Sequence, residues 1–144
     1  TETQATFSSC FGAAFLTLHP IQYAEVFENK ILKHNPKIYL INTGWNGKKE
    51  RLSLEKTRNI INQINMNSIK HDEFLTIPYF NLKIPNSLLK DDLNFYDPRL
   101  SFNEMKDWDI NALKLAEKFN NNFQKFKFVG SSIVDKYSSF GPKI

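Results

Sequence analysis

The chain has 144 residues, a hydrophobic fraction of 41% that includes 13 Phe, and a formal net charge of +4 at pH 7. This size and apolar content predict one domain over residues 1–144 with a core of its own. No run approaches the roughly 20 apolar residues that a membrane-spanning helix needs, so we expect no membrane partner. The basic cluster at residues 48–51 is interrupted by Glu50 and is too short for a nucleic-acid arm, so we expect no nucleic-acid partner.

The cysteine and histidine content limits the disulfides, nucleophiles and metal sites that the chain can form. Cys10 is the single cysteine, which excludes an internal disulfide and predicts a reducing, cytoplasmic setting. It has no basic neighbour in sequence, so we expect a small apolar side chain and not a nucleophile. The histidines are isolated from one another, and no metal site is expected. The start, residues 1–4, has neither an initiator Met nor a signal-peptide pattern, so we expect a piece cut from a longer chain.

The first third of the chain predicts a buried segment, a helix and a strand. Residues 6–18 are small, aromatic and apolar, which favours a buried loop or strand. Pro20 suits the first turn of a helix that ends before Asn35 and Pro36. Its apolar stripe consists of Tyr23, Ala24, Phe27 and Ile31. The run 38–41 predicts a strand covered on both faces, as in parallel sheets.

A glycine turn and a second helix follow. Residues 43–47 predict a turn, and Ser53 is expected to cap a helix that carries Ile60, Ile61 and Ile64 on one face. Helix, strand, glycine turn and helix together indicate an α/β fold, in which ligands bind beyond the carboxyl ends of strands. The turn matches no known phosphate-loop pattern. Its glycines therefore either let backbone amides face an anion or simply permit positive φ.

The second half predicts two extended segments and two further helices. Pro78 and Pro85 punctuate residues 72–85 and favour an edge position. Asp97-Pro98-Arg99 indicates a turn, and Ser101 or Asn103 is expected to cap a third helix. The helical stripe there consists of Met105, Trp108, Ala112, Leu113, Ala116, Phe119 and Phe123. A short helix is expected near residues 132–137.

Few side chains suggest chemistry. Arg51, Thr57 and Arg58 surround the start of the second helix, where guanidinium groups can stack on a base or pair with an anion. A solvated Arg51 and a Thr57 that merely supports the first helical turn are the structural alternatives. Trp45 in the turn predicts either packing across the domain or a pocket wall. No pair of carboxylates is placed for acid–base catalysis.

Several segments taken in order resemble the C-terminal end of the ATP-dependent phosphoenolpyruvate carboxykinases, and the resemblance spans nearly the whole chain. These segments are residues 6–15, 18–20, 23–25, 42–47, 80–85, 97–99 and 141–143, together with Arg51, Ser53, Thr57 and Arg58. Each is weak alone, but the ordered set is specific.

The resemblance implies the C-terminal portion of that family's nucleotide-binding domain, an α/β fold with a mixed sheet flanked by helices. It implies a cytoplasmic lyase, a decarboxylase of gluconeogenesis, that converts oxaloacetate and ATP into phosphoenolpyruvate, ADP and carbon dioxide with Mg and Mn. The implied partners are ATP, oxaloacetate and the rest of the same polypeptide. The family's phosphate loop, metal ligands and oxaloacetate-binding residues lie upstream of the matched region. We therefore expect no catalytic residue here, and an inactive isolated chain.

The resemblance also implies site residues. Within the pattern R-x-S-x-x-x-T-R, Arg51 and Leu52 would lie against the adenine of ATP and Thr57 would contribute a hydroxyl. The chain departs from the family at residues 48–50, where Lys-Lys-Glu replaces T-G-K and a loop glycine is lost. That departure leaves open a stand-alone, non-catalytic nucleotide-binding module. The positive charge and the phenylalanines leave open a nucleic-acid binder.

Overall fold

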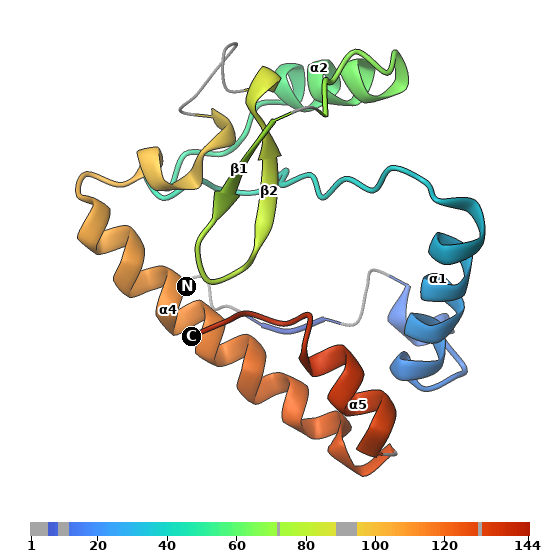
Figure 1. Cartoon of the computed structure of the whole chain (residues 1–144). Coiled ribbons are helices and arrows are strands. Elements are labelled where there is room, and N and C mark those ends of the chain that lie inside the picture. Colours follow the sequence, from blue (N-terminus) through green and yellow to red (C-terminus); the bar gives the residue numbers. More distant parts are fainter. Residues whose placement is uncertain (1–5, 9–11, 72, 89–94, 130) are drawn as a thin grey trace. The chain divides into compact units, whose positions relative to one another are not determined.

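The computed structural model describes residues 6–8, 12–71, 73–88, 95–129 and 131–144. The predictions for Cys10 and for residues 1–4 lie outside these ranges. The chain divides into two compact units, residues 1–39 and 40–144, which are described separately (Figure 1). The prediction of one domain over the whole length stays a prediction.

Helix α1, Pro20–His34, is the main element of the first unit and confirms the predicted helix. Its start is capped twice: His19 Nδ1 accepts from the amide of Ile21 at 3.3 Å, and Gln22 Oε1 accepts from the amide of His19 at 3.2 Å. These bonds satisfy amide groups that a helix start leaves open. The helix ends at Asn35, which has a left-handed backbone with φ 44°.

Two predicted elements of the first third are wrong. Apart from the half-buried Gly12, the described part of residues 6–18 is exposed. It contains only the short helical turn η1, Ala13–Phe15, in which Phe15 is 87% exposed. Residues 38–41 are not a buried strand either: they belong to no sheet, and Leu40 is 80% exposed. A strand requires hydrogen bonds from a neighbouring strand, and none of the described segments pairs with this run.

In the second unit, α2, Leu54–Asn65, is the predicted second helix. Ser53 Oγ accepts from the amide of Lys56 at 3.2 Å, which is the expected cap. Ile60 is buried, whereas Ile61 is 41% exposed, so the apolar face is narrower than predicted.

A hairpin confirms the predicted extended segments at an edge. Strands β1, Phe74–Ile77, and β2, Leu82–Pro85, pair antiparallel, so each is an edge strand. The turn between them includes Tyr79 and Asn81 in left-handed conformations, with φ 64° and 52°. The amide of Lys143, near the other end of the unit, donates to the carbonyl of Tyr79 at 2.7 Å. Helices and this small sheet are consistent with an α/β fragment.

The remaining elements are helical. The turn η2, Pro98–Ser101, precedes α4, Met105–Phe123. The predicted cap of this helix is wrong, because the N-cap is Glu104, which makes no side-chain capping bond. Ser101 instead ends η2. After α4 come η3, Gln124–Val129, and α5, Ser131–Ser138, the second of which confirms the predicted short helix (Figure 1).

The core of the second unit joins the hairpin to α4. Ile77, Trp108 and Ala112 are buried together. The partly buried side chains packed against them are Tyr79, Phe80, Ile84 and Phe102. The rings of Tyr79 and Trp108 stack with centroids 5.8 Å apart. Phe102 is therefore the point at which the segment after η2 enters the core.

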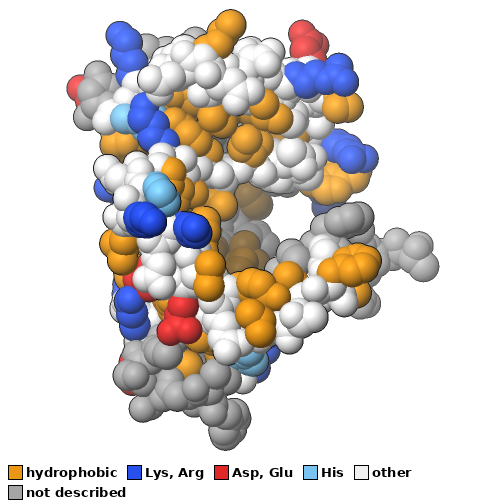
Figure 2. All heavy atoms as spheres, turned by 90° about the vertical axis from the view of Figure 1, so that its right-hand side faces the viewer, with side chains coloured by type: hydrophobic (Ala, Val, Ile, Leu, Met, Phe, Trp, Pro, Cys, Tyr) orange, Lys and Arg blue, Asp and Glu red, His pale blue; other side chains and the backbone are white. Residues whose placement is uncertain are grey.

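Much apolar surface remains at the exterior. Figure 2 shows hydrophobic side chains on the face that it draws, with lysine and arginine side chains between them. Leu32 in α1 is 74% exposed and Met66 after α2 is 79% exposed. Within the described ranges, no helix combines the length and apolarity needed to cross a bilayer.

Candidate functional site

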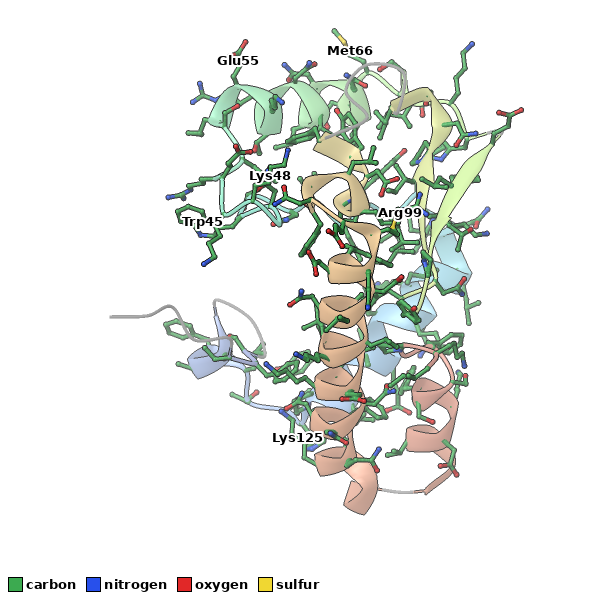
Figure 3. All side chains as sticks on the ribbon, turned by 90° about the vertical axis from the view of Figure 1, so that its left-hand side faces the viewer. Trp45, Lys48, Glu55, Met66, Arg99 and Lys125 are labelled. Carbon is green, nitrogen blue, oxygen red and sulfur yellow. The ribbon has the colours of Figure 1, made fainter. Side chains whose placement is uncertain are left out.

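The predicted turn at residues 43–47 is part of a closed loop from Gly44 to Leu52. The amide of Leu52 donates to the carbonyl of Gly44 at 2.9 Å, and Trp45 and Arg51 form an antiparallel bridge. The loop thus returns the chain to the start of α2. Figure 3 shows Trp45 and Lys48 on this loop, beside the first turn of α2 that carries Glu55.

Asn46 organises the loop from inside. Its Oδ1 accepts from the amides of Lys48 at 3.0 Å and Glu50 at 2.9 Å. Its Nδ2 donates to Glu50 Oε2 at 2.9 Å. Asparagine commonly holds a turn by such side-chain bonds to its own backbone neighbours. The loop is therefore shaped by local bonds before any ligand is present.

Lys49, where the resemblance leads one to expect glycine, has a left-handed backbone, with φ 61°. A residue with a Cβ pays about 1–2 kcal/mol for that conformation, a cost that glycine lacks. The loop therefore keeps a glycine-like backbone at this position although the side chain is lysine. The bonds from Asn46 to the residues on either side offset the strain.

Gly47 is required for space and not for positive φ, which corrects one of the two predicted alternatives. Neither Gly44 nor Gly47 has a left-handed φ. A Cβ at Gly47 would overlap the ring of Phe102 and lie 2.7 Å from Ser101 Oγ. The amide of Gly47 donates to Ser101 Oγ at 2.9 Å, across 54 residues of sequence. The amide thus faces a protein hydroxyl in this structure.

A shallow cavity of about 190 Å³ lies between this loop and the start of α2. It is lined by Asn46, Glu50, Arg51, Leu52, Ser53, Lys56 and Phe95. Lys56 Nζ lies 5.0 Å from the centroid of the Phe95 ring, within cation–π range. The cavity is smaller than the roughly 300–1,000 Å³ of typical small-molecule sites, so it fits one ring system and not a whole nucleotide.

The structure brings together two of the three predicted nucleotide contacts. Arg51, which is exposed, and Leu52, which is half-buried, both line the cavity. Thr57 does not line it, and its hydroxyl donates to the carbonyl of Ser53 at 3.0 Å, as a residue supporting the first helical turn does. Arg58 is not in the lining either.

Trp45 follows neither predicted alternative. Its side chain is 62% exposed and lines neither of the two cavities described here. Figure 3 shows it at the outer side of the loop. Its backbone bridge to Arg51 is what fixes it in the loop, so the indole is left free to contact another surface.

Five of the seven residues that line the cavity were not predicted as site residues: Asn46, Glu50, Ser53, Lys56 and Phe95. Lys56 follows directly from the helix cap, since its amide donates to Ser53 and its side chain emerges one turn from Leu52. Phe95 lies far along the chain and has no local signal that points to the loop. A second cavity, of about 350 Å³, lies between the end of α4 and α5, and Asn120 and Pro142 are among its lining residues.

No catalytic or metal-binding arrangement is visible among the described residues. No three His, Cys, Asp or Glu side chains in those ranges lie together as a metal site requires. The described ion pair with shifted pKa values joins Asp97 and Arg99, which lie in and next to η2 and outside the cavity lining. The ionisable side chains that line the cavity are those of Glu50, Arg51 and Lys56, and one oxygen of Glu50 already accepts from Asn46.

Comparison with known proteins gives two findings. A family model described as phosphoenolpyruvate carboxykinase matches residues 1–92. The phosphoenolpyruvate carboxykinase (ATP) of Wigglesworthia glossinidia brevipalpis is 46% identical over 143 residues, which are 99% of this chain and 26% of the relative. The chain thus spans about a quarter of that relative's length. The loop and α2 lie inside the range of the family match, whereas η2 lies beyond it.

Proposed function

The chain belongs to the ATP-dependent phosphoenolpyruvate carboxykinase family, and from this premise we propose that it is the C-terminal part of an enzyme of that activity. The whole enzyme converts oxaloacetate and ATP into phosphoenolpyruvate, ADP and carbon dioxide, in the cytoplasm and in gluconeogenesis. This chain contributes the adenine side of its nucleotide site. The family match does not favour a stand-alone binding module.

The observation that carries the proposal is the shared cavity of Arg51 and Leu52. Leu52 and the ring of Phe95 offer apolar contacts for the faces of a planar base, and Arg51 and Lys56 add cations at the edge. Glu50 also lines the cavity, but one of its oxygens accepts from Asn46. In this proposal Thr57 supports α2 and orders the approach to the cavity, and a direct hydroxyl contact requires its side chain to leave Ser53.

The remaining parts of the reaction are assigned to the rest of the polypeptide. The cavity is too small for a triphosphate, so the phosphate contacts lie elsewhere. Mg and Mn, when bound by the enzyme, neutralise charge on the transferring phosphoryl group. We assign no metal ligand to this chain, because its described residues offer no suitable group of side chains.

Substitution of Arg51 tests the nucleotide role. In the full-length protein, we expect Arg51→Ala to raise the Kd for ATP about tenfold, the equivalent of about 1.4 kcal/mol, because a charged contact at the base or its ribose phosphate is lost. Titration with ATP measures the change. Arg58→Ala is the matched control, since Arg58 is an exposed arginine in α2, seven residues further along and outside the cavity, and it should change the Kd less than twofold. Equal affinity of Arg51→Ala and the unmodified protein contradicts the proposal.

The purified 144-residue chain tests whether the phosphate and metal contacts are supplied by the rest of the polypeptide. We expect no formation of phosphoenolpyruvate from oxaloacetate and ATP in the presence of Mg and Mn, and ATP affinity weaker than micromolar, because phosphate and metal contacts are missing. A coupled assay for phosphoenolpyruvate, with the full-length protein as positive control, measures this. Turnover by the isolated chain shows instead that it holds a catalytic site.

A further inference from the structure

Ser101 connects the nucleotide loop to a distant part of the chain. Its Oγ accepts from the amide of Gly47 at 2.9 Å and donates to the carbonyl of Pro98 at 2.7 Å. One hydroxyl has a single proton and free lone pairs, so both bonds form at once. Ser101 is 4% exposed, and loss of either bond leaves a buried polar group without its partner.

The turn that carries Ser101 is itself held rigidly. Asp97, 3% exposed, accepts from the amide of Arg99 at 3.0 Å. It also accepts from Arg99 Nε at 2.9 Å and from Arg99 Nη2 at 2.7 Å, a bidentate ion pair. Pro98 fixes the backbone between them. The Asp97-Pro98-Arg99 motif thus presents the Ser101 hydroxyl at a defined position.

The close approach of Gly47 to Phe102 also restricts the position of the loop. A Cβ at Gly47 would overlap the ring of Phe102, so glycine alone lets the loop approach this closely. Phe102 packs against the core that contains Trp108. The loop is therefore placed against the core by one hydrogen bond and one close backbone approach. Four residues after Gly47 the same loop delivers Arg51 and Leu52 to the cavity.

We infer that Ser101 is a positioning residue of the nucleotide site: its hydroxyl fixes Gly47, and through the closed loop it sets where Arg51 and Leu52 meet the base. This inference rests on the proposed function and extends it to a residue outside the matched range and outside the cavity lining. It also assigns a role to the Asp97-Pro98-Arg99 motif, which holds the Ser101 hydroxyl in place and otherwise touches no part of the candidate site.

The experiment compares Ser101→Ala with Ser139→Ala in the full-length protein. Both serine hydroxyls donate to the carbonyl three residues earlier, and only Ser101 also accepts the distant amide. We expect Ser101→Ala to raise the KM for ATP about fivefold while kcat and the KM for oxaloacetate change less than twofold. Hydrogen–deuterium exchange of a peptide covering residues 44–52 should accelerate by a similar factor. Ser139→Ala should alter none of these values.

Ser101→Cys is measured beside the alanine variant, because a thiol fills nearly the same space and is a weak acceptor. It should change the same values in the same direction, and it supplies the result if the alanine variant does not fold. Equal loss in kcat and in both KM values overturns the inference and leaves Ser101 a structural residue. Unchanged exchange and unchanged KM for ATP also overturn it.

The outcome for Arg51→Ala separates this inference from the proposed function. If that variant weakens ATP binding and the Ser101 variants do not, only the positioning role fails. If Arg51→Ala leaves ATP affinity unchanged, the proposed site fails, and accelerated exchange in Ser101→Ala then reports a loop contact without a nucleotide role, which overturns the inference as well.

Discussion

Trp108→Ala is expected to lower the local stability of the second unit by about 3–5 kcal/mol, because it removes a buried indole and leaves a cavity. Trp108 is 5% exposed and stacks on Tyr79, so the stack between α4 and the hairpin is lost with it. Amide hydrogen exchange of α4 in the full-length protein measures the effect. Exchange should accelerate by a factor of roughly 100 to 4,000.

The control lies on the same helix. Leu115 is 43% exposed, so Leu115→Ala removes little buried surface and should change α4 exchange less than about tenfold. Similar acceleration in both variants shows that Trp108 is not the centre of the core. Trp108→Phe should fall between the two, because a smaller ring keeps part of the contact with Tyr79.

Asp97→Asn is expected to destabilise the segment around η2 by about 1–3 kcal/mol at pH 7, because it removes the charge from a hydrogen-bonded pair in which the carboxylate is buried. Burial raises the pKa of Asp97, but the hydrogen bonds from the side chain and amide of Arg99, with its charge, outweigh burial and leave the pKa below its usual value. Exchange of a peptide covering η2 measures the loss.

The sign of the pH dependence follows from the lowered pKa. The contribution of Asp97 is complete above its unfolded pKa of about 3.9 and is lost as the pH falls through the lower folded value. The difference between Asp97→Asn and the unmodified protein should therefore shrink below about pH 4. Asp135→Asn, the same change at an exposed site in α5, should leave exchange of the η2 peptide unchanged at pH 7. A difference that grows on acidification contradicts the assigned pKa direction.

Local signals explain which elements the sequence predicted well. The boundaries of α1 follow from Pro20 and Asn35, and the start of α2 follows from Ser53, because caps and breakers act within one helical turn. The two prolines likewise placed the hairpin at an edge. In each of these cases the residues that decide the structure lie next to it in the chain.

The prediction of a strand at residues 38–41 was wrong because a strand is decided by a segment that is not its neighbour in the chain. Its apolar run predicts burial, but burial and pairing depend on a neighbouring segment that no spacing reveals. The expected burial of residues 6–18 was wrong for the same reason, since Phe15 and Leu18 are 87% and 51% exposed. An apolar pattern indicates that a segment is suited to burial, and the partner must be known separately.

In the candidate site, too, residues that are neighbours in the sequence were predicted, and residues that reach the site only through the fold were not. Arg51 and Leu52 are adjacent, and the resemblance places both at one site. Phe95 and Ser101 reach the loop only through the fold, so neither was predicted. Ser101 has the sequence signature of a helix cap, yet its hydroxyl accepts an amide from the glycine loop. The roles of Arg51, Leu52 and Thr57 in binding ATP stay predictions.

The hydrogen bond from the Lys143 amide to the Tyr79 carbonyl can form only after both residues have been synthesised. A hairpin such as β1–β2 forms in about 1–10 μs once its residues are free to move. Synthesis at about 5–20 residues per second separates Tyr79 from Lys143 by about 3 to 13 s. During that interval the carbonyl at the hairpin tip is open to water or to another chain. The rate of synthesis, and not the intrinsic speed of the hairpin, therefore limits how early this hydrogen bond can form.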